Sequence, residues 1–139
     1  MKHRLYYIKP FFLLFIGFLF INGSYKKPPL KPDYSNVGGF VIGKEICNAD
    51  TSKDYWLLDF TVYPNTPKIG DTLILNNVTY TNVLKVKGLD PRLKDIGMRV
   101  SIDYKVITND KMLTSGCTVS NPVTYPLKEI FIINQGEIR

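Results

Sequence analysis

Residues 98–107 read MRVSIDYKVI, and their side chains alternate strictly between apolar and polar. Alternation with a period of two is typical of a β-strand that buries one face and leaves the other in water. This stretch therefore predicts a sheet protein. The apolar residues are Met98, Val100, Ile102, Tyr104 and Val106, and the polar ones between them are Arg99, Ser101, Asp103 and Lys105.

The segments on either side of this strand predict further strands separated by turn residues. Asn76-Asn77 is expected to form a two-residue hairpin turn, because asparagine tolerates a positive φ. The unbroken apolar run Ile130–Ile133 indicates a last strand that is covered on both faces or closes a barrel. The predicted strands, besides 98–107, span residues 37–47, 55–63, 72–75, 78–86 and 127–134.

A short helix is predicted between the hairpin and the strand at 98–107. Asp90 is placed as its N-cap, Pro91 as its first residue and Gly97 just past its end. Leu93 and Ile96, three residues apart, are expected to share the face that packs inward.

This order of elements predicts a mainly β domain: a small five- to six-stranded antiparallel barrel of the OB type, with one short helix. A six-stranded sandwich fits the same order. Over residues 38–134 the chain also resembles a group of small exported bacterial proteins with OB-like barrels. The resemblance implies this fold and carries over no catalytic residue. It rests on Gly43–Cys47, Tyr55–Leu58, Leu93–Gly97 before Val100–Tyr104, Cys117 and Leu127–Ile130.

The N-terminus is typical of a secretion signal. Basic residues precede an uncharged apolar run, Phe11–Ile21, and small residues follow it. The run is short for a membrane-spanning helix, which needs about 20 apolar residues, although an uncleaved anchor is the alternative. We expect a signal peptide over residues 1–23, a Pro/Lys linker over 24–36 and the domain over 37–139. The mature protein would be exported, to the periplasm or outside the cell, and would meet a membrane only through an uncleaved signal segment.

The cysteine and histidine counts limit the chemistry. Cys47 and Cys117 are both in the exported part, and an even count in an oxidising compartment predicts one disulfide. A redox pair or metal ligands are the alternatives, but there is no C-x-x-C motif. The one histidine, His3, lies in the signal, so the mature chain lacks the residue that Ser-His-Asp and Cys-His nucleophiles need. We expect no metal and no cofactor.

The candidate site residues are aromatic and basic side chains on the predicted wet faces. Tyr55 and Tyr63 have the opposite phase to the core residues of their strand, and Arg99 and Lys105 lie on the polar face of 98–107. Such residues could form a ligand-binding surface, since OB barrels bind oligosaccharides and oligonucleotides. The alternative interpretation is that these residues lie on an ordinary solvent-exposed face with no ligand. The aromatic residues Trp56, Phe60 and Tyr104 are expected in the core instead.

The leading functional hypothesis is an exported, non-enzymatic binding or interaction module, with a glycan or a protein as the favoured ligand. Without the signal the net charge falls from +6 to about +3, and so small a charge is only weak support for the binding of polyanions. Export also argues against the binding of nucleic acid. The alternative is a hydrolase of a cell-surface polymer that works through carboxylates alone. Its candidate residues are Glu45, Asp59, Asp71 and Asp103.

Overall fold

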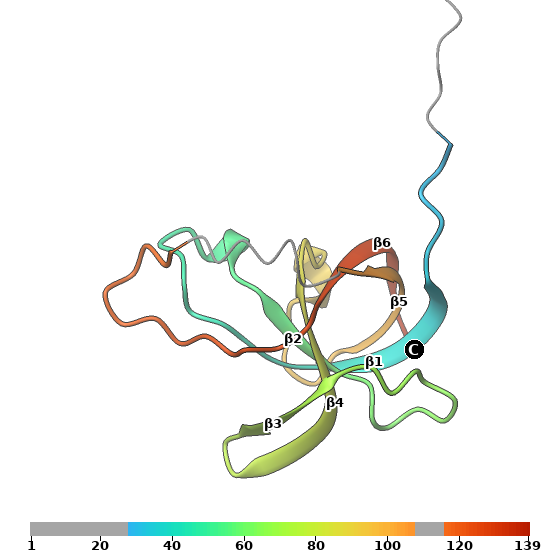
Figure 1. The fold of residues 1–139 in the computed structure, drawn as a ribbon, viewed down its shortest axis with the longest axis horizontal. Coiled ribbons are helices and arrows are strands. Elements are labelled where there is room, and N and C mark those ends of the chain that lie inside the picture. Colours follow the sequence, from blue (N-terminus) through green and yellow to red (C-terminus); the bar gives the residue numbers. More distant parts are fainter. Residues whose placement is uncertain (1–27, 108–115) are drawn as a thin grey trace, which may run out of the picture.

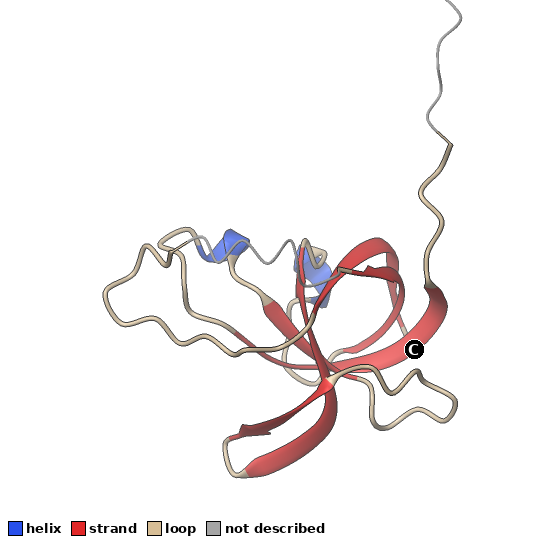
Figure 2. Ribbon diagram, in the orientation of Figure 1, coloured by secondary structure: helices blue, strands red, loops and turns tan. Residues whose placement is uncertain are grey.

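A computed structural model of the chain describes residues 28–107 and 116–139. The signal expected at 1–23 and the first four residues of the linker expected at 24–36 lie outside these residues. The described part is mainly β, with two short 3₁₀ turns as its helical elements (Figures 1 and 2). The strands are β1 (Tyr34–Lys44), β2 (Trp56–Asp59), β3 (Asp71–Leu75), β4 (Val78–Lys87), β5 (Arg99–Val106) and β6 (Glu129–Glu137).

All six strands belong to one sheet of mixed orientation, in the order β2-β1-β5-β6-β4-β3. β2 also pairs with β4, so the pairings from β2 through β1, β5, β6 and β4 return to β2. The expectation of purely antiparallel strands is wrong at one place, where β4 and β6 pair in parallel. β6 lies between β5 and β4. It runs antiparallel to β5 along one edge, and along its other edge it runs in the same direction as β4.

β1 begins earlier than the sequence suggested, at Tyr34, inside the segment expected to be linker. Tyr34 is paired with Tyr104 on β5, and the two rings lie 5.3 Å apart. Before it, the backbone N–H of Asp33 donates to the carbonyl of Tyr104. Contacts with β5 therefore extend the strand in spite of the preceding prolines.

β2 is shorter than predicted because the chain turns at its end. The Asp59 carboxylate accepts hydrogen bonds from the backbone N–H and the hydroxyl of Thr61. This local arrangement ends the strand four residues before Tyr63. β6, in contrast, begins two residues later than expected, at Glu129, after a tight turn in which the Leu127 N–H donates to the Tyr125 carbonyl.

The inner face of the sheet carries the main core. The alternation of β5 is confirmed, since Val100, Ile102 and Tyr104 are all buried. Trp56 and Phe60 are also in this core, as their phase on the second strand predicted. Most of the hydrophobic stabilisation of the domain comes from this cluster.

A second, smaller apolar cluster lies on the other face of β2 and β4. It joins Leu57, Leu73, Val83 and Leu127. β2 is therefore buried on both faces, and all four of its residues are inaccessible. The last strand was predicted to be covered on both faces or to close a barrel. The double covering is wrong, since Phe131 on β6 is 53% exposed and the second cluster forms over β2 and β4 instead; β6 pairs with a strand along each edge, β5 and β4.

The hairpin turn is confirmed, and the predicted helix is only a 3₁₀ turn. Asn76 and Asn77 connect β3 to β4 with φ values of 50° and 64°. Pro91–Leu93 forms the turn, and the Asp90 carboxylate accepts the N–H of Arg92 as a cap. Ile96 is 74% exposed rather than packed inward, because the turn ends at Leu93 and its register is lost.

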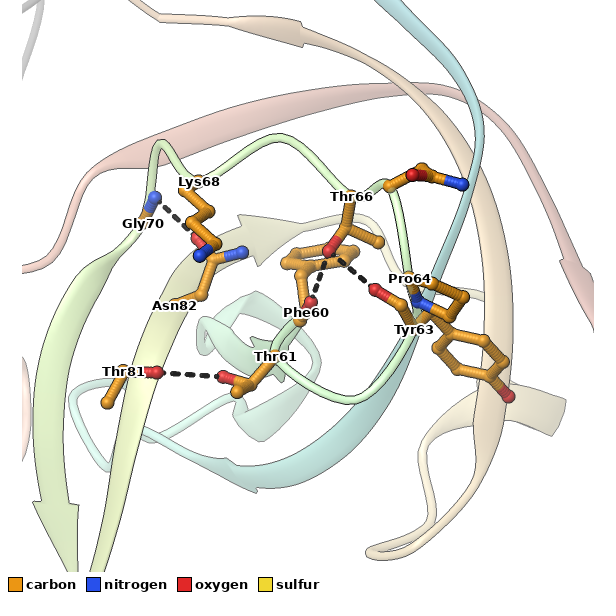
Figure 3. Close-up of a pocket in the computed structure, with 10 residues that line it drawn as sticks. Phe60, Thr61, Tyr63, Pro64, Thr66, Lys68, Gly70, Thr81 and Asn82 are labelled. Carbon is orange, nitrogen blue, oxygen red and sulfur yellow. Dashed lines mark hydrogen bonds between the residues drawn. The ribbon is translucent and has the colours of Figure 1, made fainter.

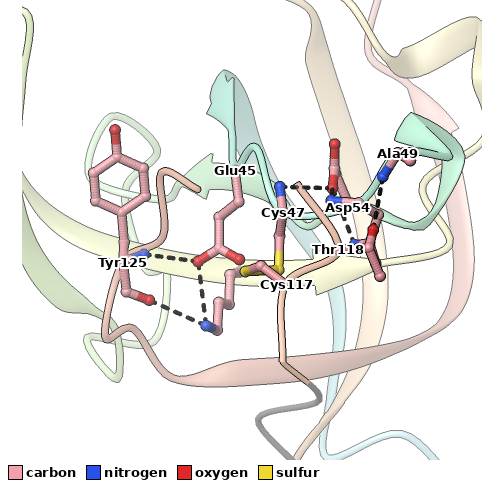
Figure 4. Close-up of a disulfide and its surroundings, with 9 residues drawn as sticks. Glu45, Cys47, Ala49, Asp54, Cys117, Thr118 and Tyr125 are labelled. Atoms are coloured by element: carbon pink, nitrogen blue, oxygen red, sulfur yellow. Dashed lines mark hydrogen bonds and ion pairs between the residues drawn. A yellow bond between two sulfur atoms is a disulfide. The ribbon is translucent and has the colours of Figure 1, made fainter. Parts of the chain in front are cut away.

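The predicted disulfide is confirmed: Cys47 and Cys117 are bonded, with their Cα atoms 4.6 Å apart (Figure 4). It fastens residues 116–128, here called the strap, to the segment after β1. The Thr118 N–H donates to the Cys47 carbonyl, and Ile46 pairs with Val123 as an isolated bridge. No helix within the described ranges is long and apolar enough to cross a membrane.

A buried ion pair holds the far end of the strap. The Glu45 carboxylate accepts hydrogen bonds from Lys85 Nζ at 3.3 Å and from the backbone N–H of Tyr125 at 2.8 Å (Figure 4). Lys85 Nζ also donates to the Tyr125 carbonyl, at 3.1 Å. Because both charges are paired and hydrogen-bonded, removing either one would leave an uncompensated buried charge.

Reduction of the disulfide is expected to lower the free energy of unfolding by about 2–5 kcal/mol, because a closed loop spanning 70 positions is released in the unfolded chain. Thermal denaturation followed by circular dichroism should show Tm falling on the order of 10 °C. The Cys47→Ser, Cys117→Ser variant should melt at the lower temperature and show no further response to reductant. Two free thiols in freshly purified, non-reduced protein would contradict this expectation.

Candidate binding groove

Two of the four predicted site residues, Tyr63 and Arg99, meet around Phe40. The Tyr63 and Phe40 rings are stacked, with centroids 5.6 Å apart and planes 21° apart. The Arg99 guanidinium lies 5.7 Å from the centre of the Phe40 ring. Phe40 and Arg99 are direct partners across β1 and β5, so the sheet register produces this contact.

Tyr55 and Lys105 lie elsewhere. The Tyr55 hydroxyl donates to Glu129 at 3.0 Å, and Lys85 and Lys87 lie against its ring. Burial, and then the bond to Glu129, raise the pKa of Tyr55 above its ordinary value. Lys105 forms an exposed ion pair with Asp33 at 3.7 Å. The structure thus divides the predicted set between separate parts of the surface.

A trench crosses the outer face of β1, β5 and β6. Gly38, Ser101 and Gly136 are partners in register across the three strands. Their side chains are absent or small, so this row forms a low floor between larger neighbours. A Cβ atom at Gly136 would meet nothing within 4 Å, which shows that the floor is open there. We call this feature the trench.

One wall of the trench is aromatic and is formed by Tyr63, whose ring is stacked on Phe40. Tyr63 lies directly over Gly38, where a Cβ atom would come within 2.9 Å of the tyrosine ring. Only glycine therefore allows the ring to lie this close to β1.

The other wall carries amide and carboxylate groups from Asn36, Asp103 and Asn134. Asn36 has a positive φ of 59°, and its N–H donates to the Asp103 carboxylate at 2.6 Å. The Ser101 hydroxyl donates to the Asn36 side-chain oxygen at 2.9 Å. Asn134 Nδ2 lies 3.5 Å from the second oxygen of Asp103. These bonds fix the direction of the polar groups along the wall.

A further hollow, the loop pocket, shares Tyr63 with the first hollow over the trench. Figure 3 shows the residues that line the loop pocket. The loop pocket has a volume of about 440 Å³, and the two hollows over the trench have about 730 and 470 Å³. Such volumes are in the range of small-molecule sites. The loop pocket is lined by Phe60, Thr61, Tyr63, Pro64, Asn65, Thr66, Lys68, Gly70, Thr81 and Asn82.

The loop between β2 and β3 is held in shape by internal hydrogen bonds (Figure 3). The Thr66 hydroxyl donates to the Phe60 carbonyl at 2.6 Å and lies 3.0 Å from the Tyr63 carbonyl. The buried Asn82 side chain accepts from the Gly70 N–H at 2.8 Å and donates to the Pro67 carbonyl at 3.0 Å. Tyr63 is therefore presented by an ordered loop, which reduces the entropy cost of binding.

The four carboxylates considered for a hydrolase are all engaged in structural contacts. Glu45 pairs with Lys85, and Asp71 pairs with Lys128 at 3.2 Å. Asp59 caps the turn at Thr61, and Asp103 holds the N–H of Asn36. Among residues 28–107 and 116–139, no group of three or more His, Cys, Asp or Glu side chains is placed to hold a metal ion.

The groove, meaning the trench together with the loop pocket, is suited to binding a polar ligand that also has an apolar face. Sequence reasoning identified Tyr63 and Arg99 but missed Phe40, Gly38, Gly136 and the amide wall. The polar phase of 98–107 already placed Ser101 and Asp103 on the wet face. Which residues of β1 and β6 lie beside Ser101 depends on the register of strand pairing, and this register could not be predicted from the sequence. Comparison of the chain with protein-family models, curated proteins and solved structures finds no match.

Replacing Asn82 with alanine is expected to destabilise the domain by about 1–3 kcal/mol, because the Gly70 N–H loses its acceptor. Amide hydrogen exchange should also show faster exchange in the loop between β2 and β3. Thr81→Ala is the matched control, since this neighbouring side chain is exposed and should change Tm little. Equal melting temperatures for the Asn82→Ala and Thr81→Ala variants would show that Asn82 does not hold the loop.

Proposed function

We propose that this chain is an exported, non-enzymatic binding module that takes a glycan in the groove. The observation that carries the proposal is the trench between an aromatic wall at Tyr63 and a wall of amide and carboxylate groups at Asn36, Asp103 and Asn134. Neither wall contains a carboxylate pair free for acid–base chemistry, since Asp103 holds the Asn36 N–H.

The chemistry of the walls matches the two kinds of surface that a sugar presents. Tyr63 offers a ring that can pack against the C–H face of a pyranose, and its stacking on Phe40 fixes that ring in place. Asn36 and Asn134 offer amide donors and acceptors for hydroxyl or acetamido groups. At Gly136 the open floor allows a ligand to approach the backbone closely.

The fold supports the proposal by analogy only. We infer an OB-like barrel, because five strands form a cyclic set of pairings, β1 pairs with β5, and a short helical turn precedes β5. OB barrels commonly bind oligosaccharides or oligonucleotides on the face of their second and third strands. In this chain the corresponding face, on β2 and β4, is covered by Leu73 and Leu127, which leaves the face of β1, β5 and β6 for a ligand.

Export is supported by two features. The disulfide is compatible with an oxidising compartment, and the N-terminal 23 residues have the composition of a signal. Glycans are abundant ligands at the cell surface, so the proposed location and the proposed ligand agree.

A protein ligand is a second candidate, favoured by the β3–β4 hairpin. The hairpin projects from the rest of the molecule (Figure 1) and exposes Ile74 by 68% and Val78 by 49%. Exposed apolar side chains on a projecting edge are a feature of protein-binding surfaces. The groove offers more positioned polar groups, so the glycan is the preferred ligand.

The test is calorimetric titration of the purified protein with two hexasaccharides, one of β-1,4-linked N-acetylglucosamine and one of β-1,4-linked glucose. We expect binding of at least one of them, and Tyr63→Ala should weaken it by about tenfold or more, since a ring at the centre of a site has the effect of a hot spot. Phe131→Ala, an exposed aromatic outside the groove, is the matched control and should leave the affinity unchanged. Loss of affinity in both variants alike, or binding of neither sugar, would count against the proposal.

A further inference from the structure

We infer that the groove binds an internal stretch of a linear glycan chain, longer than a disaccharide, rather than a single sugar or a chain end. This inference rests on the proposed function and specifies its ligand. The observation behind it is that the loop pocket and the two hollows over the trench adjoin one another in a row and share lining residues.

The continuity follows from shared lining residues. The loop pocket and the first hollow over the trench share the ridge Tyr63–Thr66. The two hollows over the trench share Ser35, Asn36 and Ser101. A ligand can therefore pass from the loop pocket over the Tyr63 ridge and along the trench without leaving the surface.

The length of the path exceeds one sugar. Neighbouring strands lie about 4.8 Å apart, so the row from Gly38 on β1, which lies under the Tyr63 ring, through Ser101 to Gly136 on β6 spans about 10 Å. The loop pocket extends the path beyond Tyr63. A monosaccharide would occupy only part of it.

Both ends of the path are open. Thr61 and Thr81 at the loop-pocket end are exposed, with their hydroxyl oxygens 3.3 Å apart (Figure 3). Asn134 at the opposite end is also exposed. Because the residues at both ends are exposed, a chain can continue in both directions.

Hydroxyl and amide groups recur along the lining, together with the charged side chains of Lys68, Glu137 and Asp103. Hydroxyl or amide groups occur in the loop pocket at Thr61 and Thr81, and again over the trench at Ser35, Asn36 and Asn134. The recurring hydroxyl and amide donors and acceptors fit a ligand made of repeated units. Tyr63 at the middle of the path provides the apolar contact.

The experiment is a length series of β-1,4-linked N-acetylglucosamine oligosaccharides, from the monosaccharide to the hexasaccharide, with the glucose series in parallel. Affinity for the series that binds should rise at least about tenfold between disaccharide and hexasaccharide. Thr81→Val, which removes a hydroxyl at the loop-pocket end, should weaken the hexasaccharide severalfold and leave the disaccharide, bound over the trench, unchanged. Thr79→Val, an exposed threonine on the same strand outside the groove, should affect neither.

The outcomes separate this inference from the proposed function. Equal affinity for disaccharide and hexasaccharide, still weakened by Tyr63→Ala, would overturn the inference and keep the binding module. An equal effect of Thr81→Val on both lengths would also overturn it. Binding of no length in either series would contradict the proposed function itself.

Discussion

Strand β2 is hydrogen-bonded along both edges, to β1 and to β4, and is covered on both faces. Its side chains alternate between two apolar clusters, with Leu58 in the larger and Leu57 in the smaller. The other strands are arranged around this constraint. β4 must supply Val83 and Leu84 to opposite faces, and the strap must supply Leu127 to the outer cluster. The disulfide and the Glu45–Lys85 pair hold the strap in that position.

The same constraint determines where a ligand can bind. Because β3 and the strap cover the outer face of β2 and β4, that face offers apolar packing instead of an open surface. The outer face of β1, β5 and β6 is left to solvent. The loop that leaves β2 at Asp59 then places Tyr63 over Gly38 at the margin of this face. Because the protein's own residues cover the outer face of β2 and β4, the candidate site lies on the outer face of β1, β5 and β6.

Local patterns in the sequence predicted local features well. The alternation of 98–107, the turn at Asn76-Asn77 and the disulfide are confirmed, because each depends on residue types that few arrangements accept. The inward packing of Ile96 and the double covering of the last strand were predicted wrongly, because an apolar side chain does not reveal which partner covers it. The trench was not predictable, since Gly38, Ser101 and Gly136 meet only through the register of three strands.

The central claim, that the groove on β1, β5 and β6 is the ligand site, is tested most directly by mapping amide chemical shifts. A two-dimensional ¹H–¹⁵N spectrum of the uniformly labelled protein would be recorded during titration with the N-acetylglucosamine hexasaccharide, or the glucose hexasaccharide if that is the one that binds. Perturbations should concentrate at residues 35–38, 61–66, 99–103 and 134–136. Perturbations confined to the strap or to the β3–β4 hairpin would contradict the claim.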